Sequence, residues 1–232
     1  MLPDAAAVAA EAARRFVAAV GATSGTLAIA LAGGSTPKAA YALLGGTHAP
    51  EVDWARVTLV FGDERCVPPD HADSNHLMVK RALLDPLAAQ ARAPREVLRI
   101  EGELDPDEAA RRYAARLAAL PGHGAVPRLD LVLLGMGADG HTASLFPGSP
   151  VLTAGGIVAA TPEAHAGHRR VTLTYGALDA ARAIVVLVTG AEKAGPLKLA
   201  LDGPVGAVPL RDVRPTAGSM IFVCDRAAAP AL

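Results

Sequence analysis

The stretch Thr26-Leu-Ala-Ile-Ala-Leu-Ala-Gly-Gly-Ser-Thr-Pro-Lys38 decides the fold, because it joins a predicted strand to a predicted helix through two glycines. Residues 26–31 form a continuous apolar run, as expected of a strand that is buried on both faces of a parallel sheet. A helix is predicted over 36–44, with Pro37 in its first turn, where the missing N–H is tolerated. A strand, a turn and a helix in this order make the repeating unit of an α/β fold.

The same alternation of apolar runs and helical patterns continues along the whole chain. Helices are predicted over 4–20, 74–84 and 105–120 and near 176–182 and 191–201, and further strands over 57–61, 97–100, 129–134, 171–174, 183–188 and 220–224. This pattern predicts an α/β fold with a mainly parallel sheet flanked by helices. There is no internal repeat and no long linker, and surface connections are expected at 87–95 and 121–128. We therefore expect one domain over 1–232.

Composition excludes several classes of protein. The chain has 232 residues, of which 51% are hydrophobic and 19% charged, enough to bury a core. Its 22 basic and 23 acidic residues give a net charge of -1, without the basic excess that nucleic-acid binding needs. No apolar run approaches the roughly 20 residues of a membrane span, and the first residues do not fit a signal peptide. Cys66 and Cys224 lack a zinc-site spacing. We expect a cytoplasmic protein without metal or cofactor.

The first candidate site is the glycine-rich turn after residues 26–31. Ligands of open α/β sheets bind beyond the carboxyl ends of the strands, which is where this turn lies. Gly33 and Gly34 allow backbone N–H groups to approach an anion, and Ser35 and Thr36 add hydroxyl donors at a helix N-terminus. The sequence therefore predicts a phosphate site, with a plain tight turn and N-cap as the alternative. The turn matches neither a P-loop nor the dinucleotide fingerprint.

A second candidate follows the strand at 57–61, where three charged residues, Asp63, Glu64 and Arg65, stand together. Arg65 can hold a phosphate in a two-pronged geometry. Asp63 can orient a sugar hydroxyl or a catalytic imidazole, and Glu64 is expected to be an internal partner for an arginine. The alternative is a solvated turn. Ser74 and Asn75 follow this segment.

A third candidate is the turn Gly135-Met-Gly-Ala-Asp-Gly-His141, which again follows a strand. Its glycines permit positive φ and a close approach to a ligand. Histidine changes its charge near neutral pH, so His141 is a candidate general base, with Asp139 two residues before it. Lys193 follows another strand and is a weaker candidate for binding phosphate, since a solvated helical lysine fits equally well.

Taken in order along nearly the whole chain, these segments resemble the 6-phosphogluconolactonase family, whose wider superfamily includes glucosamine-6-phosphate deaminase. The segments that carry the resemblance are Gly33 to Pro37, Gly62 to Arg65 with Ser74-Asn75, Gly135 to Gly148, Arg170 to Thr174 and Gly190 to Lys193. The resemblance implies a Rossmann-like sheet related to ribose-5-phosphate isomerase and CoA transferases.

The resemblance also implies a reaction and a set of site residues. The reaction is hydrolysis of 6-phospho-D-glucono-1,5-lactone in the oxidative pentose phosphate pathway, with water activated by His141. Either Asp139 or Asp63 orients the imidazole. The residues expected to bind the phosphate or sugar are Gly34, Ser35, Thr36, Arg65, Asn75, Gly140, Arg170 and Lys193. The partner is this small molecule alone. The sequence does not give the oligomeric state, and a monomer is the working expectation.

The deaminase branch is the nearest alternative. The corresponding motif of the deaminases resembles Asp-Gly-His-Ile-Ala-Phe-Asn-Glu-Pro-Gly, and its glutamate assists opening of the sugar ring. In this sequence Phe146 stands at the position of that glutamate. Arg65 also replaces the tyrosine of its Asp-Glu-Tyr segment, and both departures favour the lactonase. A non-catalytic sugar-phosphate-binding protein would not need a titrating base such as His141. A nucleotide-binding protein is a further alternative, but this chain contains neither the P-loop nor the dinucleotide fingerprint. The segment with His165 and His168 receives no role.

Overall fold

A computed structural model describes residues 1–120 and 126–229, and within them a six-stranded parallel sheet forms the centre. Its strands are β1 (Leu27–Leu31), β2 (Val57–Phe61), β4 (Glu96–Leu98), β5 (Leu131–Gly135), β8 (Ala183–Val188) and β9 (Ser219–Cys224). Every pairing in the order β4-β2-β1-β5-β8-β9 is parallel. The predicted α/β class is therefore confirmed.

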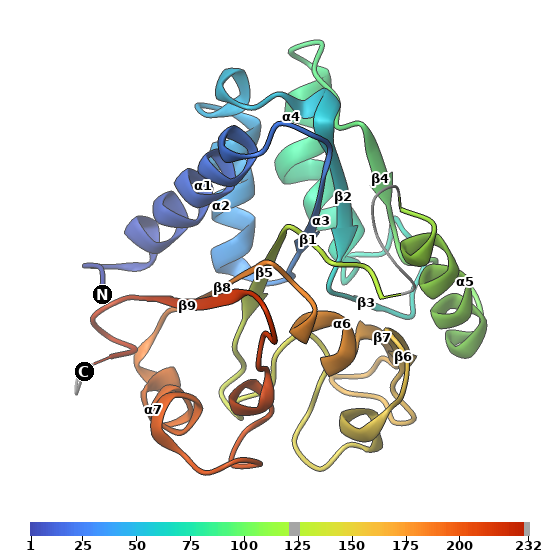
Figure 1. The fold of residues 1–232 in the computed structure, drawn as a ribbon, viewed down its shortest axis with the longest axis vertical. Helices are drawn as coiled ribbons and strands as arrows, with labels where there is room; N and C mark the ends of the chain where they lie inside the picture. The colour runs from blue at the N-terminus through green and yellow to red at the C-terminus, as the bar shows by residue number, and fades with distance from the viewer. Residues whose placement is uncertain (121–125, 230–232) are drawn as a thin grey trace.

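Helices cover both faces of this sheet. They are α1 (Ala5–Ala22), α2 (Ser35–Gly45), α3 (Asn75–Val79), a π-helical turn (Lys80–Leu84), α4 (Asp85–Ala88), α5 (Pro106–Ala118), α6 (Tyr175–Asp179) and α7 (Ala194–Asp202). Short 3-10 turns occupy Ala49–Glu51, Trp54–Arg56, Pro150–Thr153, Ala191–Lys193 and Pro209–Asp212. Helices α1 and α2 pack together on one side, whereas α6 and α7 lie on the other (Figure 1). The connection expected at 121–128 lies partly outside the described residues.

A second, antiparallel sheet of three short strands departs from the predicted single sheet. It consists of β3 (Asp63–Arg65), β7 (Arg170–Leu173) and β6 (Val158–Ala160), in the order β3-β7-β6. The strand predicted over 171–174 belongs here, and β3 and β6 were not predicted because three residues are too few to show a periodic pattern. In the register of β3 and β7, Arg65 lies opposite Arg170. The small sheet therefore brings two candidate cations together.

The order of the parallel strands determines where a ligand can bind. The chain proceeds from β1 to one side, through β2 and β4, and from β5 to the other, through β8 and β9. The connections at the carboxyl ends of β1 and β5 therefore diverge, which leaves a crevice at this point. Both predicted glycine-rich turns follow these two strands.

Two buried tyrosines fix the strand ends near the crevice. The Tyr41 hydroxyl accepts a hydrogen bond from the N–H of Ala32 and donates one to its carbonyl oxygen, each at 2.9 Å. Tyr113 makes the same pair of bonds to the backbone of Phe61, at 2.7 and 2.8 Å. Burial raises the pKa of both hydroxyls, so both remain protonated donors. The carboxyl ends of β1 and β2 are thus held rigidly by side chains from α2 and α5.

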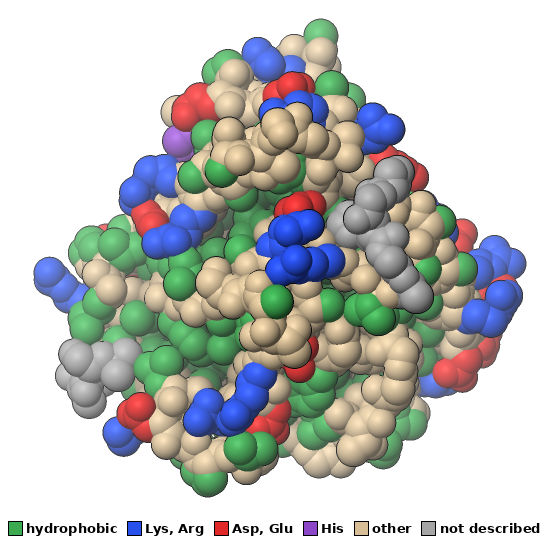
Figure 2. Space-filling model, in the orientation of Figure 1, with side chains coloured by type: hydrophobic (Ala, Val, Ile, Leu, Met, Phe, Trp, Pro, Cys, Tyr) green, Lys and Arg blue, Asp and Glu red, His purple; other side chains and the backbone are tan. Residues whose placement is uncertain are grey.

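The core and the surface fit the composition. One cluster of buried apolar side chains runs from α1 through the parallel sheet to Val171 and Leu173 of β7. On the face in Figure 2, basic and acidic side chains are interspersed rather than gathered in a basic stripe. Among the described helices, none combines the length and the apolar character needed to cross a bilayer.

Candidate active site

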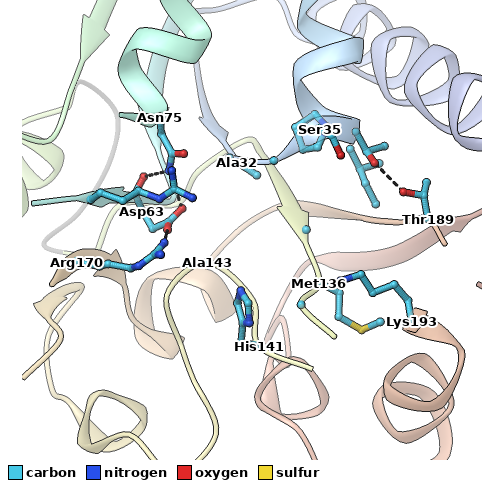
Figure 3. Close-up of a pocket in the computed structure, with 18 of the residues that line it drawn as sticks. Ala32, Ser35, Asp63, Asn75, Met136, His141, Ala143, Arg170, Thr189 and Lys193 are labelled. Carbon is cyan, nitrogen blue, oxygen red and sulfur yellow. Dashed lines mark hydrogen bonds and ion pairs between the residues drawn. The ribbon is translucent and has the colours of Figure 1, made fainter. Parts of the chain in front are cut away.

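A cavity of about 380 Å³ opens at the carboxyl ends of β1 and β5, and it gathers most of the candidate residues (Figure 3). The predicted residues that line it are Gly34, Ser35, Thr36, Asp63, Arg65, Asn75, His141, Arg170 and Lys193. Asp139 and Gly140 do not line it, because they form the turn that supports His141. The three glycine-rich or charged segments inferred from the sequence therefore meet at one place.

One wall of the cavity is the N-terminus of α2. Gly34 precedes the helix with φ of 104°, a backbone conformation that favours glycine. Ser35 and Thr36 form the first turn, and the Thr36 hydroxyl lies 2.8 Å from that of Thr189. The Lys193 side chain is mostly buried, and its ammonium lies 4.0 Å from the nearest Glu192 oxygen, at the limit of an ion pair. This wall offers helical N–H groups, hydroxyls and a weakly paired cation, which together suit an anion.

Two arginines form another part of the lining. Arg65 donates from Nη1 to the carbonyl oxygen of Asp73, and Arg170 donates from Nη2 to that of His165 at 3.1 Å. Both Nε atoms are buried without a hydrogen-bond partner. Burial lowers the pKa of Arg170. The Asp63 carboxylate, 3.9 Å away, opposes this effect of desolvation but only in part. A buried N–H without an acceptor is costly, so each of these arginines keeps unmet hydrogen-bonding capacity beside the cavity.

Asp63 is held among the side chains of three other segments. Its Oδ2 accepts a hydrogen bond from the Ser144 hydroxyl at 2.7 Å, and its Oδ1 accepts one from the Asn75 amide at 3.3 Å. Asn75 also donates to the Asp63 carbonyl oxygen at 2.9 Å. A Cβ on Gly33 would lie 2.3 Å from the Asn75 amide oxygen, so glycine is required where β1 ends. These contacts direct Asp63 towards the Arg170 side of the cavity.

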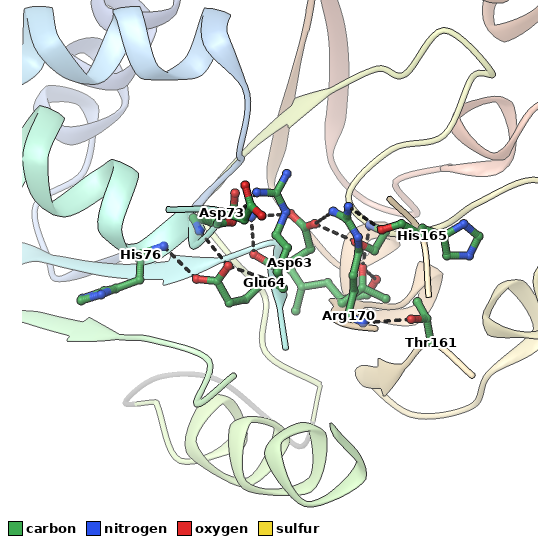
Figure 4. A network of polar contacts seen from close by, with 12 residues as sticks. Asp63, Glu64, Asp73, His76, Thr161, His165 and Arg170 are labelled. Carbon is green, nitrogen blue, oxygen red and sulfur yellow. Dashed lines mark hydrogen bonds and ion pairs between the residues drawn. The ribbon is translucent and has the colours of Figure 1, made fainter. Parts of the chain in front are cut away.

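Glu64 does not have the expected arginine partner, and this expectation was wrong. Its carboxylate instead accepts hydrogen bonds from the Ser74 hydroxyl at 3.0 Å and from the N–H groups of Arg65, Asn75 and His76 at 2.7–2.8 Å (Figure 4). Two of these N–H groups belong to the first turn of α3, whose positive end attracts a carboxylate. Burial raises the pKa of Glu64, although these donors oppose the rise. Glu64 therefore anchors α3 beside the cavity.

His141 and Asp139 form a pair within a tight turn. Their Nδ1 and Oδ1 atoms lie 2.6 Å apart, and Oδ1 also accepts the N–H of His141 at 3.1 Å. The Gly137 N–H donates to the His141 carbonyl oxygen, and Gly140 has φ of 79°. Burial raises the pKa of Asp139, but the hydrogen bonds and the charge of His141 lower it further, so its net pKa lies below the usual value. The ionised carboxylate accepts Nδ1–H, which leaves Nε2 as the basic atom.

Phe146 provides an apolar surface against which the imidazole packs. Its ring centroid lies 4.5 Å from that of His141 and 3.7 Å from that of His165, with which it is stacked. The guanidinium carbon of Arg170 lies 5.6 Å from the centroid of the same ring. The contact of His165 with Phe146 could not be predicted, because a single histidine in a loop carries no sequence pattern.

A histidine cluster next to Arg65 was also missed. His71, Asp73 and His168 place one potential metal-ligand atom each within 4.8 Å of one another. However, Nδ1 of His71 already accepts the N–H of Asp73 at 3.1 Å, and Nε2 of His168 lies 2.9 Å from the Asp73 carboxylate. The potential ligand atoms of His71 and His168 therefore already have hydrogen-bond partners on Asp73.

The fold and the cavity define a doubly wound α/β protein with a wall suited to an anion and a His–Asp pair at the switch point of its sheet. A family model described as glucosamine-6-phosphate isomerases/6-phosphogluconolactonase matches residues 3–222. The chain belongs to this family.

Curated relatives and solved structures agree with this assignment. The 6-phosphogluconolactonase of Treponema pallidum is 42% identical over 163 residues, which cover 68% of this chain and 66% of that protein. The 6-phosphogluconolactonase of Homo sapiens is 39% identical over 178 residues, covering 75% and 68%. The chain thus spans about two thirds of the length of these curated relatives. The comparisons confirm the resemblance inferred from the sequence and the expectation of an enzyme of the lactonase type.

Among solved structures, 6-phosphogluconolactonase from Trypanosoma brucei has a TM-score of 0.85 and 31% identity, covering 100% of this chain and 97% of that one. A structure described as devB protein has a TM-score of 0.89 and 34% identity, covering 100% and 98%. A monomeric glucosamine-6-phosphate deaminase has a TM-score of 0.80 at 20% identity, covering 99% and 98%, which shows the shared fold alone.

Proposed function

We propose that the chain hydrolyses 6-phospho-D-glucono-1,5-lactone to 6-phospho-D-gluconate, the lactone-opening step of the oxidative pentose phosphate pathway. The observation that carries this proposal is the 2.6 Å contact between His141 and Asp139, with the imidazole lining the same cavity as Ser35, Arg65 and Lys193. A base and an anion site in one cavity suit a substrate whose reacting carbonyl is held by a distant phosphate.

In this proposal the 6-phosphate binds at the N-terminus of α2. Ser35 and Thr36 donate hydrogen bonds from the first helical turn, and Arg65 and Lys193 supply positive charge. The position of Arg65 supports its role, because it lines the cavity and a guanidinium can hold a phosphate in a two-pronged geometry. Asp63 and Asn75 line the same cavity and offer a carboxylate and an amide to the sugar hydroxyls.

The reaction then needs one proton transfer in each direction. Nε2 of His141 takes a proton from water as the water oxygen forms a bond to C1 of the lactone. Asp139 keeps Nδ1 protonated and stabilises the imidazolium, the role of the carboxylate in a catalytic triad. As the bond between C1 and the ring oxygen breaks, the imidazolium returns the proton to that oxygen. The N–H groups of Gly137, Gly140 and His141 already donate inside the turn, so the oxyanion must use other donors.

Gly137→Ala is expected to lower kcat by about 100-fold, the size of effect that a shift of about 1 Å in a catalytic group can produce. A Cβ at this position would lie 2.1 Å from Nδ1 of His141 and 2.5 Å from the Asp139 carboxylate, so the pair must move. Steady-state kinetics on the phosphorylated lactone measure the effect. Gly155→Ala is the control, because nothing lies within 4 Å of its Cβ. A wild-type kcat in Gly137→Ala would show that the position of the pair is unimportant.

Arg65→Ala is expected to raise KM for the phosphorylated lactone roughly 10- to 100-fold with a smaller change in kcat, because hydrogen bonds to charged groups contribute about 1.5–3 kcal/mol. The KM for unphosphorylated gluconolactone should stay the same. Arg95→Ala is the matched control, since Arg95 is exposed and does not line the cavity. Equal KM values in Arg65→Ala and the wild type would exclude Arg65 as a phosphate ligand.

The proposed reaction is tested against the deaminase reaction with one enzyme preparation and two substrates. Phe146 occupies the position of the ring-opening glutamate of the deaminase branch and packs against the imidazole, so no carboxylate stands there. The preparation should open the lactone and release no ammonia from glucosamine 6-phosphate. Ammonia release in the absence of lactone hydrolysis would replace the proposal with the deaminase reaction.

A further inference from the structure

The two cavity arginines are fixed at their base by the small sheet and at their tips by two loops. Arg65 and Arg170 face each other in the register of β3 and β7. At the tips, the carbonyl oxygen of Asp73 accepts a hydrogen bond from Arg65, and that of His165 accepts one from Arg170 (Figure 4). The direction of each guanidinium group thus depends on where its loop is held.

One side-chain pair joins these two loops. Nε2 of His168 lies 2.9 Å from the Asp73 carboxylate, across 95 positions of sequence. His165 and His168 are tied together by backbone hydrogen bonds of 2.9 and 3.4 Å, so the position of one fixes the other. The hydrogen bond from His168 is the main cause of the lowered pKa of Asp73. The pair therefore links the carbonyl acceptor of one arginine to that of the other.

The position of the pair argues against a role in overall stability. The side chains of Asp73 and His168 are 57% and 25% exposed, and exposed ion pairs contribute little to the free energy of unfolding. Both arginines, in contrast, line the cavity and carry a buried Nε without a hydrogen-bond partner. Loss of this contact should change the free energy of unfolding little. The contact does hold the carbonyl oxygens that accept hydrogen bonds from Arg65 and Arg170, so it is suited to orienting these two side chains.

We propose that Asp73 and His168 form a clasp that positions Arg65 and Arg170 for binding the phosphorylated substrate. The pair touches neither the substrate nor the reacting atoms, so it acts only through the arginines. This inference rests on the proposed function for its substrate, but anion binding can be measured without any hydrolysis.

The test compares His168→Ala with His48→Ala. His48 forms a similar exposed pair with Glu51, at 2.8 Å, and lies outside the cavity. Calorimetry with inorganic phosphate gives the dissociation constant, and kinetics give KM and kcat. We expect His168→Ala to raise the phosphate dissociation constant and KM about 3- to 10-fold, with kcat and Tm unchanged, since oriented donors lose less freedom on binding. His168→Gln should restore part of the affinity, because its amide can donate to Asp73.

Three outcomes would overturn the clasp. They are an unchanged phosphate dissociation constant in His168→Ala, an equal weakening in His48→Ala, and a loss confined to kcat. If His168→Ala lowers Tm, Asp73→Ala gives the same test, because it removes the carboxylate and keeps the backbone carbonyl to which Arg65 donates, and the same three outcomes apply. A wild-type protein that binds phosphate through an intact clasp but does not open the lactone would refute the proposed function and leave the clasp supported.

Discussion

His141→Ala is expected to lower kcat for 6-phosphogluconolactone by roughly 10²–10⁴-fold, the range for loss of a general base. The imidazole lines the cavity, its Nδ1 is held by Asp139, and its ring packs on Phe146. Without it, no described side chain takes its place beside Asp139. KM should change little, because the phosphate is bound by α2, Arg65 and Lys193.

The measurement is the initial rate after subtraction of spontaneous hydrolysis, at mildly acidic pH where that background is slow. Circular dichroism and Tm should match the wild type, because the His141 side chain is one-third exposed and its removal opens no large buried void. His48→Ala serves as a control for loss of a histidine elsewhere. A variant that keeps its fold and the wild-type kcat would remove His141 from the mechanism.

Asp139→Asn is expected to have an effect of the same order, a fall in kcat of up to about 10⁴-fold, by comparison with the carboxylate of a serine-protease triad. The amide is neutral, so it cannot stabilise the imidazolium, and its NH₂ group can face Nδ1 and favour the wrong tautomer. The lowered pKa of Asp139 means that the carboxylate is ionised in the folded protein at neutral pH. Loss of that charge should therefore affect kcat more than KM.

Asp63→Asn is the comparator, since the sequence left open which carboxylate orients His141. Asp63 contacts Ser144, Asn75 and Arg170, so its substitution should act mainly on KM. Kinetics of the two variants on one substrate separate the roles. A larger loss of kcat in Asp63→Asn than in Asp139→Asn would assign the orienting role to Asp63 instead of Asp139.

Much of the parallel sheet could be predicted from the sequence. Strands buried on both faces are continuous apolar runs, so β1, β2, β5, β8 and β9 fall within two residues of their predicted limits. The small sheet could not be predicted in the same way. β3 is a run of three charged residues and β6 is three residues long, and both form strands only because β7 lies between them.

Most candidate residues were found because they follow a buried strand, and the carboxyl ends of parallel strands meet at one edge. Asn75 and Arg170 do not follow a strand, and they were inferred from the family resemblance. Contacts that depend on distant segments were not found. Asp139 and His141 are only two residues apart, so their pairing could be proposed from the sequence, with Asp63 as the alternative partner of His141. Asp73 and His168 are single polar residues in separate loops, and only the fold brings them together.

The most direct test of the central claim is the rate at which the purified protein opens freshly prepared 6-phosphogluconolactone, measured above the spontaneous reaction. The proposed site predicts rapid, saturable hydrolysis that depends on the 6-phosphate, so unphosphorylated gluconolactone should react far more slowly at the same concentration. A rate indistinguishable from the background, with a folded protein that still binds inorganic phosphate, would contradict the lactonase assignment.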